Sequence, residues 1–270
     1  MTQLEGSWQR MLEGHAYARP AAEILGHAAA ATALIAQSLK FDGTVTLQIS
    51  TGGPLGMLVM QCTDRLDLRG MTSAHDIDEH ARFADLVSGA SCAVTVDAGE
   101  MERPYQGIVE ISPDSLAASL ESYFARSVQV PSHLKLVSTS SHCGGILLQQ
   151  MPGGTRVLDD DWRRLGFLAE TLRSEDIADG VSKTLLHKLF AEDDVRAFEP
   201  RPTRFRCRCS QDRVEDVLRM LGEVETRKAL DESGSVDVTC EFCGRLRSFD
   251  AVDVSRVFAG TIVAGPNSLH

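Results

Sequence analysis

Four cysteines in the last third of the chain have the residue type and spacing of a metal site. Cys207 and Cys209 form a Cys-x-Cys pair, and Cys240 and Cys243 follow as a Cys-x-x-Cys pair after thirty intervening residues. Two such pairs can supply four thiolates to one tetrahedral zinc ion, with Zn–S bonds of about 2.3 Å. The second pair lies in CEFCG, where Gly244 allows the turn of a zinc knuckle. The four cysteines therefore predict one bound Zn²⁺.

The single residue between Cys207 and Cys209 points to a second chemistry, which is oxidation. In an extended chain, Cα atoms two residues apart lie about 7 Å from each other, and a disulfide needs roughly 4.4 to 6.8 Å. A slight turn at Arg208 would therefore let these two cysteines bond, so each pair could bind metal when reduced and close on itself when oxidised. Nearby arginines favour thiolates, which oxidants attack: Arg196, Arg201, Arg204, Arg206, Arg208 and Arg213. We expect a redox switch rather than a catalytic centre.

The expected size of the cysteine-bearing region makes such a switch effective. About sixty residues provide only a small apolar core, whereas structural zinc contributes about 10–16 kcal/mol of apparent folding energy. Domain stability is typically only about 5–15 kcal/mol. Loss of the metal is therefore expected to unfold this region.

The other three cysteines lie outside the two pairs. Cys62 and Cys92 occupy strand-like positions and are expected to be inert core thiols. Cys143 follows His142 and precedes two glycines at an expected turn. It could be exposed there and become a side route for oxidation, but this is not the favoured interpretation.

No sequence pattern makes a case for an enzyme. His75 and His80 lie among carboxylates, where a second metal site is conceivable, but a solvated helix start is the favoured interpretation. The chain has no phosphate loop of the G-x-x-x-x-G-K type, no G-x-G-x-x-G and no His-Glu-x-x-His. It also has no nucleophile with an identifiable base. We therefore predict a protein without catalytic residues.

The elements that must position these groups indicate an α+β fold. The region 1–153 is predicted to be an N-terminal core domain with a largely antiparallel sheet and packed helices. Its expected helices are Ala21–Leu39 and Asp114–Arg126, and its expected strands are Thr44–Ser50, Gly56–Cys62, Cys92–Asp97, Tyr105–Ile111, His133–Thr139 and Gly145–Gln150.

Two smaller regions follow this core. Residues 154–200 are predicted to form a helical linker. Apolar residues spaced three or four apart from Trp162 to Leu172 indicate a first helix, and a second is expected over Val181–Phe190. Short helices need a packing partner to persist, so this linker is a candidate for conditional folding. Residues 201–270 are predicted to be a C-terminal zinc-binding domain, with a strand at Ser235–Thr239 ahead of the second cysteine pair.

Composition narrows the expected partners and location. The formal net charge is -11, so the chain as a whole should repel nucleic acid and anionic membranes. No stretch reaches the roughly 18 to 20 apolar residues of a membrane helix, and the start lacks the pattern of a signal peptide. A cytoplasmic location is expected, where clustered thiols stay reduced and are better read as metal ligands than as structural disulfides.

The sequence resembles the 33 kDa chaperonin family, the redox-regulated heat-shock holdases of bacteria. The resemblance is strongest around the cysteines, in FRCRCS (Phe205–Ser210) and VTCEFCGRLRSFDAVDV (Val238–Val254). It extends in the family's order over nearly the whole chain, through Leu39–Ile49, Gly53–Cys62, Pro104–Ile111, Ser115–Leu134 and Leu189–Pro200.

The resemblance implies a mechanism that spacing alone does not give. Family members are inactive with zinc on four reduced cysteines. Peroxide with heat, or hypochlorous acid, forms two disulfides, which correspond here to Cys207–Cys209 and Cys240–Cys243. Zinc then leaves, the C-terminal domain and the linker unfold, and the protein binds unfolding clients without ATP, often as a homodimer.

Two other functions remain open from the residues themselves. The arginines around the first cysteine pair would suit a zinc-ribbon nucleic-acid-binding protein, which the acidic net charge and the lack of interleaved aromatic residues disfavour. A thiol oxidoreductase would use Cys240 and Cys243 alone, and it leaves the Cys-x-Cys pair unexplained.

Overall fold

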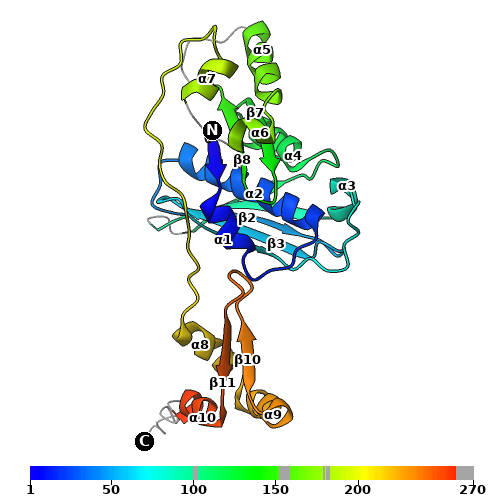
Figure 1. The fold of residues 1–270 in the computed structure, drawn as a ribbon, viewed down its shortest axis with the longest axis vertical. Coiled ribbons are helices and arrows are strands. Elements are labelled where there is room, and N and C mark those ends of the chain that lie inside the picture. The colour runs from blue at the N-terminus through cyan, green and yellow to red at the C-terminus, as the bar shows by residue number, and fades with distance from the viewer. Residues whose placement is uncertain (100–102, 152–158, 179, 181–182, 260–270) are drawn as a thin grey trace, which may run out of the picture. The chain divides into compact units, whose positions relative to one another are not determined.

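The chain folds into two compact units, Met1–Arg206 and Cys207–His270, in the computed structural model (Figure 1). The structure describes residues 1–99, 103–151, 159–178, 180 and 183–259. The predicted division into 1–153, 154–200 and 201–270 remains a prediction. The segment predicted as a linker belongs to the first unit.

A six-stranded sheet forms one layer of the first unit. The strand order is β6-β5-β2-β3-β4-β9, and all neighbours are antiparallel except β9, which runs parallel to β4. Alternation in β2 buries Val45, Leu47 and Ile49 on one face, as the period of two in a strand requires. The strands are β2 Gly43–Ser50, β3 Met57–Thr63, β4 Asp67–Thr72, β5 Ser91–Ala98, β6 Tyr105–Val109 and β9 Arg204–Phe205.

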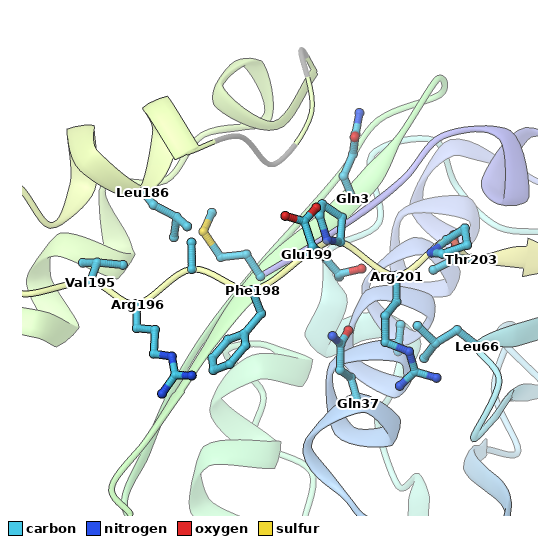
Figure 2. Close-up of a pocket in the computed structure, with 16 residues that line it drawn as sticks. Gln3, Gln37, Leu66, Leu186, Val195, Arg196, Phe198, Glu199, Arg201 and Thr203 are labelled. Carbon is cyan, nitrogen blue, oxygen red and sulfur yellow. The ribbon is translucent and has the colours of Figure 1, made fainter.

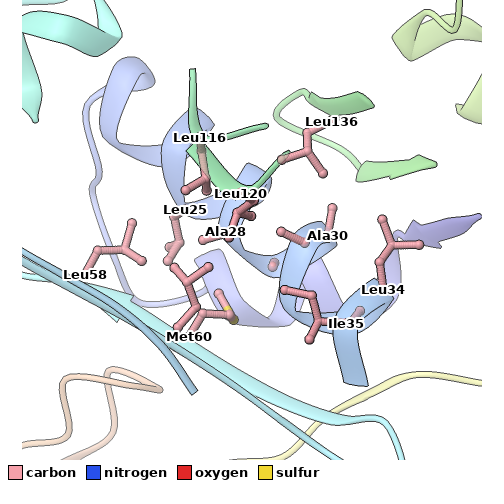
Figure 3. Close-up of a cluster of buried hydrophobic side chains, with 14 of the residues drawn as sticks. Leu25, Ala28, Ala30, Leu34, Ile35, Leu58, Met60, Leu116, Leu120 and Leu136 are labelled. Carbon is pink, nitrogen blue, oxygen red and sulfur yellow. The ribbon is translucent and has the colours of Figure 1, made fainter. Parts of the chain in front are cut away.

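Helix α2 (Arg19–Ser38) packs against this sheet with one side and against a second sheet with the other. Figure 3 shows Leu25 and Ile35 of α2 directed toward Leu58 and Met60 of the six-stranded sheet. Leu120 and Leu136, which lie outside that sheet, belong to the same cluster. Every residue from Ala28 to Ala36 is buried, because alanine side chains let two layers approach the helix closely. None of the described helices is long and apolar enough to span a membrane.

The second sheet of this unit has three antiparallel strands in the order β1-β8-β7. Gly144 and Gly145 lie inside β8, where a Cβ atom would come within 2.4 Å of the Thr2 carbonyl oxygen and 2.2 Å of the Lys135 carbonyl oxygen, respectively. The glycine pair therefore allows close strand packing, and the turn expected there is wrong. The strands of this sheet are β1 Thr2–Leu4, β7 Ser132–Ser138 and β8 Cys143–Gln149. The same unit also contains α1 Gly6–Leu12, α3 Phe83–Leu86, α4 Leu116–Tyr123 and the π-helical turn Phe124–Val128.

Three short helices cover an apolar patch of the three-stranded sheet. They are α5 (Asp159–Glu170), α6 (Ser174–Ala178) and α7 (Lys183–Leu189). Buried side chains from all three pack with Ile146 of β8 in a cluster separate from the main core. These helices thus have the packing partner that their sequence requires.

The second unit is small and has its own core. A hairpin of β10 (Val236–Thr239) and β11 (Leu246–Phe249) packs with α8 (Gln211–Leu221), α9 (Glu223–Ser233) and α10 (Ala251–Ala259). Within residues 207–259, its buried apolar side chains are Val214, Leu218, Leu230, Val236, Phe249, Val254, Val257 and Phe258.

The predicted α+β fold with a largely antiparallel sheet is confirmed. The predicted strands and the long helix lie within two residues of β2, β3, β5, β6, β7, β8, β10 and α2. The helix expected over Asp114–Arg126 is α4 followed by the π-helical turn. Of the helix expected over Val181–Phe190, residues 181–182 lie outside the described residues, and α7 forms the remainder.

Candidate metal centre

The four paired cysteines meet in the second unit. Cys207 and Cys209 lie on the segment before α8, while Cys240 follows β10 and Cys243 lies in the turn that leads to β11. All four sulfur atoms lie within 4.8 Å of one another. The Sγ atoms of Cys207 and Cys240 are 3.6 Å apart, and those of Cys209 and Cys243 are 3.5 Å apart. Residues 33 or 34 positions apart thus form one thiol cluster.

Local backbone bonds explain how each pair presents its sulfur atoms. The amide of Cys240 donates to the Arg245 carbonyl at 3.0 Å, and the amide of Gly244 donates to the Cys240 carbonyl at 2.8 Å. Gly244 has φ of 64°, a left-handed conformation that glycine adopts without steric cost. On the other side, Ser210 Oγ accepts from the Arg213 amide at 3.2 Å and starts α8. A turn and a helix cap therefore fix the two pairs.

The thiol cluster fits a tetrahedral metal ion. With metal–sulfur bonds of about 2.3 Å, neighbouring sulfur atoms in a tetrahedron lie about 3.8 Å apart, close to the observed separations. All four cysteines are half-buried, and an all-thiolate donor set suits zinc. These residues could therefore hold one metal ion.

The protonation of the cluster also favours a cation. Burial raises the pKa of Cys207 to about 12. Burial acts in the same direction on Cys209, but hydrogen bonding with the neighbouring thiols and the positive charge of Arg245 bring its pKa below the ordinary value. One thiolate is thus favoured, and further deprotonation at this site requires added positive charge.

Arg245 is the residue that the sequence reasoning missed. It lies two positions after Cys243, so its place beside the pair was the available signal. Of the arginines predicted to surround the cysteines, Arg201 and Arg206 instead bind Asp64 and Asp67 of the first unit, and Arg196 lies over the ring of Phe198. The predicted cluster is therefore only partly a feature of the metal centre.

The remaining cysteines are buried in the first unit. Burial raises the pKa of Cys62 and of Cys92 to about 12, which agrees with inert core thiols. Cys143 is completely buried in β8, and burial raises the pKa of its thiol as well. The alternative of an exposed Cys143 is therefore wrong, because Cys143 is the first residue of β8 and its side chain belongs to the main core.

The acidic segment with His75 and His80 forms no cluster of metal ligands. His75 Nδ1 lies 3.2 Å from the Ser73 carbonyl, and the His80 amide donates to Asp78 at 2.7 Å. Helix α3 begins three residues later, at Phe83. Throughout the described parts of the chain, the four paired cysteines are the one group of three or more metal-ligating side chains found together.

Comparison with known proteins identifies the family. Residues 1–250 match the family model described as Hsp33 protein. The chain is 37% identical over 264 residues to the 33 kDa chaperonin of Nitrosococcus oceani, which covers 98% of this chain and 91% of that protein. This chain belongs to the Hsp33 family. The predicted resemblance to the 33 kDa chaperonins is thus confirmed.

Further Hsp33 relatives agree. The 33 kDa chaperonin of Pseudomonas aeruginosa is 37% identical over 275 residues, 99% of this chain and 92% of that protein. The crystal structure of the 33 kDa chaperonin (heat shock protein 33 homolog) of Thermotoga maritima has a TM-score of 0.79 at 20% identity and covers 95% of this chain and 91% of that one, which supports the fold. These relatives are named as chaperonins and lend the nucleic-acid-binding alternative no support.

Proposed function

We propose that this chain is an ATP-independent holdase that is inactive with zinc bound to reduced cysteines and becomes active on oxidation. The observation that carries the proposal is the convergence of four thiols in a unit with only a small apolar core, in a member of the Hsp33 family. The functional division that we propose is a core domain at 1–153, a redox-sensitive linker at 154–200 and a zinc-binding switch domain at 201–270.

In the reduced state, Cys207, Cys209, Cys240 and Cys243 would hold one Zn²⁺. The ion would supply a positively charged cross-link among four thiolates, and it would thereby stabilise the second unit. The chain's own contribution is the turn at Gly244 and the cap at Ser210, which direct the two pairs toward one point. The thiols that the reduced state requires are maintained in the cytoplasm, which is the location we propose.

Oxidation would close each pair into a disulfide, Cys207–Cys209 and Cys240–Cys243. For each bond, two thiolates give up two electrons, and one hydrogen peroxide takes up these electrons together with two protons from the solvent and becomes two waters. Disulfide sulfur is a poor zinc ligand because the metal requires thiolate. The zinc would therefore leave, and the second unit would lose its main source of stability.

Release of the linker helices would then expose an apolar surface. Helices α5–α7 bury Ile146 and pack against Val137 and Leu148 of the three-stranded sheet. Among the described residues, polar contacts also link these helices to the sheet. Lys135 Nζ donates to Glu170 at 2.8 Å, and His142 Nε2 lies 2.9 Å from the Ser174 carbonyl. We propose that unfolding client proteins bind the uncovered face, and that the oxidised chain forms a homodimer.

The test is suppression of client aggregation. The zinc-loaded chain is treated with peroxide at elevated temperature, and light scattering then follows the aggregation of a chemically unfolded protein. Suppression by the oxidised chain, its absence with the reduced chain, and reversal by dithiothreitol are the expected results. Equal protection by both forms would contradict redox control, and turnover of a disulfide substrate would instead support a thiol oxidoreductase.

A further inference from the structure

The segment before the first cysteine pair forms an edge strand of the six-stranded sheet. Strand β9 pairs in parallel with β4, in the register Asp67 with Arg204 and Leu68 with Phe205. The amide of Arg204 donates to the Leu66 carbonyl at 3.1 Å, and the amide of Arg206 donates to the Leu68 carbonyl at 2.8 Å. β9 thus occupies the hydrogen-bonding edge of β4 with two residues.

The side chains of β9 contact complementary groups of the first unit. Phe205 is half-buried and packs against the main core, near α1. Arg206 forms an ion pair with Asp67 at 3.1 Å, and the Asp67 side chain is only 15% exposed. Without β9, the β4 edge would therefore offer unpaired main-chain carbonyl groups, an apolar surface that contacts an aromatic ring, and a partly buried carboxylate.

The segment leading to β9 is loosely held. A cavity of about 450 Å³ lies between residues 195–203 and the core, with Gln37 and Leu66 on its lining (Figure 2). The Phe198 side chain is 76% exposed. The polar contacts of this segment include Arg201 with the Asp64 carbonyl at 2.7 Å and Thr203 with Ser7 at 3.2 Å. The short ladder and the cavity beside the preceding segment are the features that would allow another strand to replace β9.

We propose that the β4 edge is a binding site for extended segments of unfolded proteins that carry an aromatic residue followed by a basic residue. The occupant is inferred from β9 itself, since the contacts of Phe205 and Arg206 show which side chains fit the edge. A client segment would replace β9 by strand addition, in which main-chain hydrogen bonds give affinity and side-chain seats give selectivity. As a site for clients of the oxidised chain, it rests on the proposed function, because β9 ends directly before Cys207.

The probe is a fluorescent peptide with the sequence of residues 202–208 and Cys207→Ser, and the measurement is its fluorescence anisotropy with the full chain. The oxidised, zinc-free chain should bind the peptide at least about tenfold more tightly than the reduced chain, because β9 then no longer competes. Methylation of the two amides equivalent to Arg204 and Arg206 should weaken binding about tenfold, as loss of two main-chain hydrogen bonds predicts.

The matched control is methylation of the amide equivalent to Phe205. Because alternate residues of a strand direct their amides to opposite sides, this peptide should bind within about twofold of the parent. In the protein, Asp67→Asn should weaken peptide binding about threefold. Asp42→Asn, at an exposed carboxylate directly before β2, should leave peptide binding unchanged.

A variant separates this site from the proposed function. The zinc-loaded, reduced double variant Arg201→Ala, Phe205→Ser has a weakened β9 and should bind the peptide without oxidation. If it does so while the oxidised chain protects no client, the β4 site stands and the proposed function fails. If the oxidised chain protects clients but neither protein distinguishes the methylated peptides, the β4 site is overturned and the proposed function stands.

Discussion

The two units of this chain differ in what stabilises them. In the first, thirty-four buried apolar side chains of the described residues form one cluster around α2 and the six-stranded sheet. In the described part of the second, eight buried apolar side chains form the core, and four half-buried thiols lie together. A large core keeps its fold without help, whereas a small core needs a cross-link. This difference supports the proposed switch, in which oxidation of the thiols would unfold the second unit and leave the first unit folded.

The largest effect should follow removal of one predicted metal ligand. Cys240→Ser should abolish zinc binding and unfold the second unit, since structural zinc contributes about 10–16 kcal/mol. Cys92→Ser, at a buried thiol of the first unit, should leave the zinc content unchanged. Limited proteolysis with mass spectrometry measures both, and a protected second unit in Cys240→Ser would remove the distinction between the units.

Core truncations in the two units should affect zinc differently. Phe249→Ala in the second unit should cost about 3–5 kcal/mol, and Leu47→Ala in the first unit should cost about 2–5 kcal/mol. Only Phe249→Ala should weaken zinc binding, because the proposed switch couples metal binding to the folding of the second unit alone. Competition with a chelating dye provides the measurement, and equal zinc affinities would argue against that coupling.

A smaller effect should follow overpacking between α5 and β7. A Cβ atom at Gly166 would lie 2.6 Å from the His133 ring, which stacks on Trp162 with a centroid distance of 4.5 Å. Gly166→Ala should therefore weaken helix docking by about 1–3 kcal/mol. Trp162 emission should shift to the red in the reduced chain, and less oxidant should be needed for activation.

The matched control for that variant is Arg163→Ala, on the exposed side of α5. It should leave the emission unchanged. The same red shift in both variants would mean that helix stability, rather than docking on His133, is being measured.

The smallest effect should be a pH dependence of the linker. Hydrogen bonding and the charge of Arg164 hold the pKa of Asp193 below its ordinary value. A lowered pKa in the folded state adds stability above the unfolded pKa of about 3.9, and this contribution disappears as the pH falls through the lower folded value. Linker docking, followed by Trp162 emission, should therefore weaken on acidification below about pH 4.

Asp193→Asn should remove that acid-induced step and slightly weaken docking at neutral pH. An unchanged acid step in this variant would assign the transition to other carboxylates of the first unit.

The sequence predicted those elements in which local pattern and burial agree. Alternation in Thr44–Ser50 and Cys92–Asp97 matched β2 and β5, and the alanine-rich helix matched α2. β9 has only two residues, and its partner β4 lies far from it in the sequence. No local sequence pattern therefore predicts this strand. Gly144 and Gly145 suggested a turn, but they serve close strand packing that only the three-dimensional arrangement creates.

The candidate site was predictable for a different reason. Metal ligands occur in short, spaced pairs, so Cys207, Cys209, Cys240 and Cys243 are recognisable without knowledge of the fold. What could not be read was which charges surround them. Arg201 and Arg206 lie near the cysteines in sequence but pair with groups of the first unit, whereas Arg245 acts on Cys209.

Native mass spectrometry of the full chain, before and after peroxide treatment, tests the central claim most directly. It reports zinc content and disulfide number in one spectrum. The expected result is one zinc per reduced chain, and an oxidised chain without zinc whose mass is four hydrogens below that of the metal-free, fully reduced chain, as two disulfides require. A chain that forms both disulfides and keeps its zinc, or that loses zinc without losing hydrogens, would contradict the account.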